Sequence, residues 1–376
     1  MNPDQLAAQL GSSVLDAGRG PCLVKRGWLG ELHINLGCEQ IWQLLGLRRP
    51  PADGIVLMDA ETTGLGSAAG VFIFLVGVAR YQHGRLHYSQ YLMLDPAWEP
   101  SLLAALAGEL ATVHTLVTFN GKAFDWPLLE ARYVLCRMQH PGEPAQHLDL
   151  LHLARRLWRD MVPRCALTTL EAAVLGRPRS WDIPNHEVPK MYFAFLRRRD
   201  PHLLQPVLEH NRHDLWALAQ LLGLLTHRLQ SGASSHPEEM LALALLHLDR
   251  GSPARAVELA ERSFRLSAGW LRTRAAYALA RCYKRLGRWQ QAVEPLQVLA
   301  QSNSPRAAWA AVELAKIFEH RLHRYREALH WVEQARRLRG QTSLGGQAIS
   351  STALRQRELR LRQKLARRMA EAGSNN

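Results

Sequence analysis

Two acidic residues, Asp59 and Glu61, stand one residue apart directly after the apolar run Ile55–Met58. The apolar run predicts a buried strand, and Thr62–Gly66 reads as a turn. Side chains two apart in a strand point to the same side, so both carboxylates project together. Two like charges this close are costly unless a cation lies between them, and hard divalent cations take oxygen ligands. An isolated Asp-x-Glu is more often a solvated strand end, so further acids must decide.

Two further acidic residues stand in informative places. Asp125 ends the sequence Asn-Gly-Lys-Ala-Phe-Asp, between a predicted strand and a predicted helix, and Asp214 lies inside a long predicted helix. His210 precedes Asp214 by four residues, so the two share one helix face. Each acid also has a simpler interpretation. Asp125 could cap the helix that follows, and Asp214 could form a surface pair with His210.

The three segments in order resemble the motifs of ribonuclease H-like 3′–5′ exonucleases that carry four acidic residues, the DEDD superfamily. These segments are Asp-x-Glu at 59–61, Asn-Gly-x-x-Phe-Asp at 120–125 and His-x-x-x-Asp at 210–214. The central one is similar to the second exonuclease motif of family B DNA polymerase proofreading domains. The whole pattern, over roughly residues 55–225, resembles the YprB-type ribonuclease H-like family of bacteria, some members of which carry tetratricopeptide repeats.

The resemblance implies a nuclease that hydrolyses phosphodiester bonds, as a 3′–5′ exonuclease on DNA or RNA. Asp59, Glu61, Asp125 and Asp214 would hold two divalent metal ions, Mg²⁺ or Mn²⁺. A metal pair neutralises charge on both the attacking and the leaving oxygen of a phosphodiester. His210 would accept or orient a proton of the attacking water, because imidazole titrates near neutral pH.

The general base stays open between His210 and Glu209. In His-type exonucleases a histidine stands five residues before the last aspartate, and in Tyr-type enzymes a tyrosine stands four before it. Here Glu209 has the first spacing from Asp214 and His210 has the second. His213 is the poorer candidate, because adjacent residues on a helix diverge.

Four residues beside the acids are implied as contacts to nucleic acid: Thr62, Asn120, Lys122 and Phe124. Lys122 could reach a phosphate. Core packing is the favoured interpretation for Phe124, and stacking against a nucleobase is the alternative. Asp149, between a predicted strand and a helix, is expected to support the site.

The elements that must position these residues predict an α/β domain with a mixed sheet flanked by helices. The prolines of 177–189 predict a loop, and residues 1–50 are expected to be a leader that packs on the domain, which we place at 51–230. Strands are predicted at 55–58, 71–81, 86–94, 116–119 and 147–150, with a hairpin turn at His83-Gly84. Helices are predicted at 100–113, 126–138, 151–160 and 203–227.

Residues 238–340 repeat with a period of 36. Ala256, Ala292 and Ala328 occupy equivalent places in three similar segments, each after a turn. This period resembles tetratricopeptide repeats, in which small residues let paired helices approach closely. A helical bundle with chance similarity is the alternative. The tail, 341–376, is rich in arginine and is expected either to touch phosphate or to cap the repeats.

The formal charge of +14, with a pI near 10.1, points to nucleic acid as the partner. Five scattered cysteines fit a reducing cytoplasm, and the longest apolar run, 68–79, is too short to cross a bilayer. The N-terminus lacks the features of a signal peptide. Two other functions stay open: a non-catalytic nucleic-acid-binding module whose repeats recruit a protein partner, and a scaffold in which the repeats themselves are the function.

Overall fold

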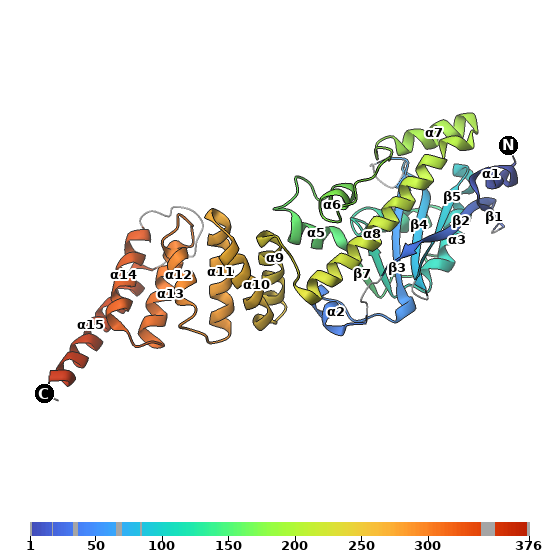
Figure 1. The fold of residues 1–376 in the computed structure, drawn as a ribbon. Coiled ribbons are helices and arrows are strands. Elements are labelled where there is room, and N and C mark those ends of the chain that lie inside the picture. Colours follow the sequence, from blue (N-terminus) through green and yellow to red (C-terminus); the bar gives the residue numbers. More distant parts are fainter. Residues whose placement is uncertain are drawn as a thin grey trace. The chain divides into compact units, whose positions relative to one another are not determined.

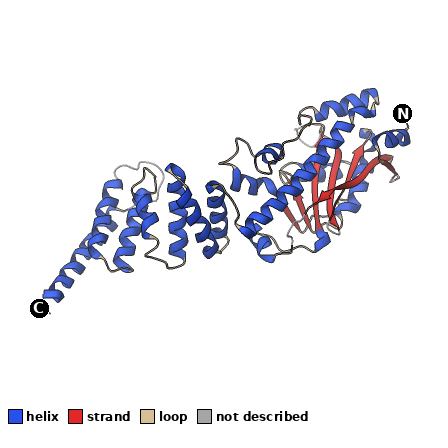
Figure 2. Ribbon diagram, in the orientation of Figure 1, coloured by secondary structure: helices blue, strands red, loops and turns tan. Residues whose placement is uncertain are grey.

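The computed structural model describes residues 2–16, 18–32, 37–64, 70–82, 85–339 and 350–373 (Figure 1). The chain forms two compact units, Met1–Ser231 and Gly232–Asn376. The first contains the whole sheet, and the second is built from helices (Figure 2). An α/β domain followed by an all-α region is therefore confirmed. Gly66 and the predicted turn at His83-Gly84 lie outside the described residues.

The sheet of the first unit has seven strands in the order β1-β2-β5-β4-β3-β6-β7. The pairs β3–β6 and β6–β7 are parallel and the other pairs are antiparallel, so the sheet is mixed as predicted. The strands are β1 (Ser13–Asp16), β2 (Pro21–Glu31), β3 (Ile55–Thr62), β4 (Ile73–Gln82), β5 (Arg85–Met93), β6 (Thr115–Thr118) and β7 (Gln146–Asp149). The helices are α1 (Pro3–Leu10), α2 (Glu39–Leu45), α3 (Glu99–Leu110), α4 (Asp125–Leu135), α5 (Leu150–Trp158), α6 (Leu167–Ala173), α7 (Val188–Arg198) and α8 (Gln205–Ser231).

Strand β3 is longer than predicted, and the acidic pair lies inside it. Ile55–Met58 is buried, whereas the following residues through Thr62 are half-buried. The strand continues because β4 pairs with it as far as Thr62, which satisfies its backbone on that edge. On the other edge β6 pairs only with Ile55–Leu57. Strand β3 therefore carries Asp59 and Glu61 beyond the end of its parallel neighbour.

The N-terminal segment forms two strands, β1 and β2, that were not predicted from the sequence. Strand β2 pairs with β5 along most of its length and extends the sheet. A Cβ at Gly27 would lie 2.7 Å from Cε1 of Tyr88, so this glycine admits a neighbouring ring. The glycines that obscured the strand pattern are therefore compatible with a strand.

Helix α8 approaches β4 closely, and a glycine permits the approach. A Cβ at Gly77 would lie 2.2 Å from Oδ1 of Asn211 and 2.8 Å from Cδ1 of Leu215. Gly77 pairs with Asp59 across the β3–β4 ladder. The close crossing thus brings the face of α8 that carries Asn211 to the acidic part of β3.

The second unit contains seven helices in its described residues: α9 (Pro237–Asp249), α10 (Pro253–Leu266), α11 (Gly269–Arg285), α12 (Val293–Ala300), α13 (Ala307–His320), α14 (Tyr325–Arg339) and α15 (Ser351–Gly373). The equivalent alanines Ala256, Ala292 and Ala328 are fully buried. This burial agrees with close helix packing, and the identification as tetratricopeptide repeats stays a prediction.

The basic tail forms helix α15, which packs within the helical unit through Leu354 and Leu361. Its Arg360 and Lys364 donate to the buried carboxylate of Glu319, at 2.7 and 2.9 Å. Burial alone would raise the pKa of Glu319, but these cations outweigh it and lower the pKa to about 2. This part of the tail therefore caps the unit. Among the described helices, none combines the length and apolarity needed to cross a membrane.

Candidate active site

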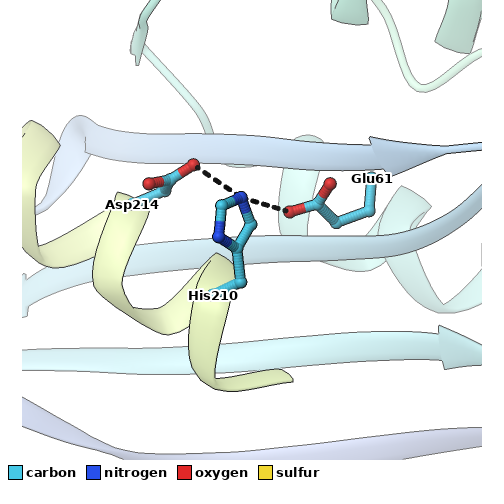
Figure 3. A group of neighbouring side chains, drawn as sticks. All are labelled: Glu61, His210 and Asp214. Carbon is cyan, nitrogen blue, oxygen red and sulfur yellow. Dashed lines mark ion pairs between the residues drawn. The ribbon is translucent and has the colours of Figure 1, made fainter. Parts of the chain in front are cut away.

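The core of the candidate site is a cluster of one histidine and two carboxylates from β3 and α8 (Figure 3). One ligand atom each of Glu61, His210 and Asp214 lies within 4.8 Å of the others. His210 Nε2 is 3.6 Å from Asp214 Oδ2 and 3.8 Å from Glu61 Oε1. His210 and Asp214 reach the cluster together because they stand four apart on one helix face.

Asp59 lies beside this cluster and is held by Asn211. The amide of Asn211 donates to Asp59 Oδ2 at 2.8 Å and to the backbone carbonyl of Asp59 at 3.2 Å. Gln90 Nε2 donates in turn to Asn211 Oδ1 at 2.9 Å. Both amides are buried, so they fix the carboxylate rather than expose it to water. Neither was predicted from the sequence, although Asn211 stands between His210 and Asp214.

Asp125 is the first residue of α4, and the N-cap position belongs to Phe124. The alternative that Asp125 caps this helix is therefore wrong. Burial and the charge of Asp149 raise the pKa of Asp125 to about 7. Asp149 accepts backbone hydrogen bonds from Asn120 at 2.8 Å, Lys122 at 3.2 Å and Leu151 at 3.0 Å. Asp149 thus ties the loop before α4 to the end of β7.

Burial and the charges of neighbouring carboxylates raise the pKa values of Asp59 and Glu61. Burial and the charges of Asp214, Glu61 and Asp125 raise the pKa of Asp59 well above its ordinary value. Burial raises the pKa of Glu61 to about 8, with the charge of His210 opposing and that of Asp214 reinforcing the effect. Such a surplus of buried negative charge requires either protons or a cation. The donor set, all oxygen apart from one imidazole, fits hard divalent ions.

Arg179 brings a positive charge to the site, and it was not predicted from the sequence. Its guanidinium donates to Glu171 Oε2 at 2.6 Å, to Asp182 Oδ2 at 2.5 Å and to Asp214. Arg179 and Asp182 lie in the loop that the prolines predicted. Pattern reasoning cannot place loop side chains, so only the fold brings them to α8. One guanidinium thereby faces three carboxylates, and its side chain is only 7% exposed.

Asp182 also holds His210. The distance from His210 Nδ1 to Asp182 Oδ1 is 2.7 Å, so Nε2 is the nitrogen that faces Glu61 and Asp214. Burial opposes protonation of His210, but the charges of Asp214 and Glu61 and the bond to Asp182 outweigh it and raise its pKa. The imidazole is thus oriented by a carboxylate behind it.

The other candidate base points elsewhere. Glu209 is 40% exposed and pairs with Arg212 at 2.8 Å on the outer side of α8. His213 is half-exposed, and burial with the charges of Arg212 and Arg179 lowers its pKa. Of the candidates named from the sequence, His210 alone belongs to the cluster with Glu61 and Asp214.

The predicted substrate contacts are not part of the cluster. The Thr62 hydroxyl donates to the carbonyl of Gly64 at 2.9 Å, and Asn120 adopts a positive φ of 69° at its turn. Lys122 is exposed. Phe124 is 54% exposed, so its expected packing in the core is wrong. Within the described ranges, no hydrogen bond or ion pair joins these four side chains to the cluster.

Comparison with known proteins identifies the family of this chain. The family described as the RNase_H superfamily matches residues 56–226. The uncharacterized protein YprB of Bacillus subtilis (strain 168) is 36% identical over 291 residues, which cover 75% of this chain and 69% of YprB. A family B DNA polymerase from Pyrobaculum calidifontis aligns with 54% of this chain and 30% of its own length, at 18% identity and a TM-score of 0.36. The chain therefore belongs to the family of YprB, and its residues 56–226 form a domain of the ribonuclease H superfamily.

Proposed function

We propose that this chain is a divalent-metal-dependent nuclease that hydrolyses phosphodiester bonds, acting as a 3′–5′ exonuclease on single-stranded ends of DNA or RNA. The observation that carries the proposal is the convergence of β3 and α8, which brings Glu61, His210 and Asp214 within 4.8 Å. The raised pKa values of Asp59 and Asp125 support a site built for cations. Superfamily membership supports nuclease chemistry, and the motif order supports the exonuclease class.

In this proposal Asp59, Glu61, Asp125 and Asp214 hold two Mg²⁺ or Mn²⁺ ions. Bound ions would supply charge neutralisation at the attacking and leaving oxygens of the phosphodiester. The chain itself supplies the geometry. Asn211 orients the Asp59 carboxylate, while Asp149 fixes the loop that presents Asp125.

His210 is the proposed general base. Its Nε2 faces the acidic cluster and would accept a proton from the attacking water. Asp182 holds Nδ1, so it selects the tautomer with a free lone pair on Nε2 and stabilises the imidazolium that forms. The outward position of Glu209 supports this choice over the alternative.

Thr62, Asn120, Lys122 and Phe124 are the proposed contacts to the substrate strand. The exposed ring of Phe124, next to Asp125, offers a face on which a terminal base can stack. The exposed ammonium of Lys122 suits a phosphate. Five free cysteines support a reducing, cytoplasmic setting for this reaction.

The test is cleavage of 5′-labelled single strands, duplexes and RNA with Mg²⁺ or Mn²⁺. The parent should produce a ladder that shortens from the 3′ end. Asp214→Asn should abolish cleavage with its circular dichroism unchanged, while Glu209→Gln, on the same helix, should cleave like the parent. Parental activity of Asp214→Asn at saturating Mn²⁺ would rule the site out. Intact strand binding without any cleavage by the parent would favour the non-catalytic module.

A further inference from the structure

The positive charge of the chain is concentrated in the helical unit. Residues 232–376 contain 25 Lys and Arg against 12 Asp and Glu, whereas residues 1–231 contain 22 against 21. The net charge is therefore +13 in one unit and +1 in the other. A polyanionic ligand would be attracted mainly by the helical unit.

One face of α11 alternates aromatic rings with cations. Trp270, Arg274, Tyr277, Arg281 and Lys284 follow at intervals of four and three residues, which places them in one row along the helix. We name this row the aromatic–cation stripe. The other face, which includes Ala275, Ala276 and Leu279, is buried in the unit, whereas Trp270 is 59% exposed. The other four residues of the stripe are half-buried, so the stripe lies at the surface of the unit. It is about 21 Å long at ~1.5 Å per residue.

Helix α13 and its N-cap residue Arg306 add a ring and two cations beside the stripe. Trp309 meets Tyr277 edge to face with centroids 5.4 Å apart, and Arg306 lies over Tyr277 at 4.6 Å. The row continues past Trp309 to Lys316, whose Nζ lies 2.7 Å from Glu313. Arg281 lies over Tyr277 at 5.6 Å. The cations thus alternate with the rings on two neighbouring helices.

Five cations gather on this face: Arg274, Arg281, Lys284, Arg306 and Lys316. Glu313 pairs with Lys284 and Lys316, and Asp249 lies 3.9 Å from Arg281. A ligand that offers both negative charge and flat rings complements these cations and covers the exposed Trp270.

We infer that the aromatic–cation stripe binds single-stranded nucleic acid, with bases stacked on its rings and phosphates beside its cations. Single strands combine a charged backbone with exposed bases, and every base has a face that stacks on an aromatic ring. A stripe of about 21 Å spans about six nucleotides at ~3.4 Å each. A duplex hides its base faces, and an acidic peptide offers charge without planar groups. The helical unit is then a binding surface for the strand.

The test measures binding of the full chain to fluorescein-labelled strands of 20 nucleotides, by anisotropy. EDTA is present throughout, so the result is independent of whether the first unit hydrolyses the strand. The ligands are one DNA sequence, the same sequence as RNA, and the corresponding DNA duplex. The parent should bind both single strands more tightly than the duplex.

Two variants separate stacking from charge. Trp270→Ala should raise Kd about 5- to 150-fold with the salt dependence unchanged, and Trp270→Phe should restore most of the affinity. The double variant Arg281→Gln/Arg306→Gln should lower the slope of log K against log salt by about 1.4, because each phosphate contact contributes ~0.7. The matched control Arg265→Gln/Arg337→Gln removes two exposed charges from α10 and α14 and should change Kd less than twofold.

Three results would overturn the inference. Parental affinity of Trp270→Ala would show that no base stacks there. If the control double variant lost as much affinity as the stripe double variant, the overall charge of the unit would explain binding and the stripe would not. The third result is that polyglutamate displaces the strand and binds tightly in a way that Trp270→Ala weakens. That result would make the stripe a surface for an acidic protein segment instead.

Discussion

The raised pKa of Glu61 makes the stability of the protein depend on pH, so the excess negative charge of the site can be measured by unfolding. This pKa is raised from 4.5 to about 8, chiefly by burial. A carboxyl group whose pKa is raised on folding keeps its proton in the folded state after the unfolded chain has lost it. It therefore costs stability as the pH rises from about 4.5, and the full cost is reached above about pH 8. At ~1.36 kcal/mol per pH unit this interval corresponds to at most about 5 kcal/mol.

Replacing Glu61 with Gln removes this cost. Without metal, the variant should be as stable as the parent near pH 4.5, and its advantage in stability should grow as the pH rises toward 8. Asp59 and Asp214 also contribute to the repulsion, so part of it remains in the variant. We therefore expect the free energy of unfolding of Glu61→Gln to exceed that of the parent by about 2–5 kcal/mol at pH 8. For a unit of 231 residues, at ~2–4 °C per kcal/mol, the melting temperature should rise by about 4–20 °C.

The assay is thermal unfolding followed by circular dichroism in EDTA at pH 5, 6, 7 and 8. Glu209→Gln is the matched control, because it removes a carboxylate of α8 that lies outside the cluster. Mn²⁺ should reverse the order at pH 8 by stabilising the parent more than Glu61→Gln. A variant less stable than the parent at pH 8 in EDTA, or a gain that is the same at every pH, would refute the reasoning.

Three further predictions follow from the same site, and a fourth concerns the helical unit. His210→Ala should lower the rate ~10²–10⁴-fold with Mn²⁺ affinity preserved by calorimetry, whereas loss of turnover in Glu209→Ala alone would transfer the role of base. Asp182→Asn should lower kcat more than it changes KM, since it disturbs the orientation of the imidazole; a change in KM alone would contradict this. Arg179→Met should destabilise the protein by about 3–5 kcal/mol at pH 7 in urea unfolding, because three buried carboxylates lose their cation, and a neutral effect would show that the cluster is hydrated instead. Residues 1–230 should fold and cleave without the helical unit; an inactive fragment beside an active full chain would show that the units depend on each other.

The sequence by itself predicted the elements whose patterns are local. The apolar start of β3, the long helix α8 and the order of α/β domain and helical region all follow from hydrophobic periodicity, which residue spacing alone reveals. The same spacing placed Asp59 with Glu61 and His210 with Asp214, because side-chain direction within one strand or one helix is set by its geometry. The roles assigned to these residues stay predictions.

Only the tertiary structure decided which of these local pairs meet and what else joins them. The crossing of α8 over Gly77 brings Asn211 to Asp59, and a loop delivers Arg179 and Asp182 from outside any periodic pattern. Strand β2 was not predicted because its glycines suggested turns, whereas in the fold Gly27 leaves room for the ring of Tyr88 on the neighbouring strand. These contacts join residues far apart in the chain, and their energies depend on burial and on the charges of distant neighbours. Neither quantity exists until the chain has folded, so the sequence could name the four acids but not the guanidinium and amides that hold them.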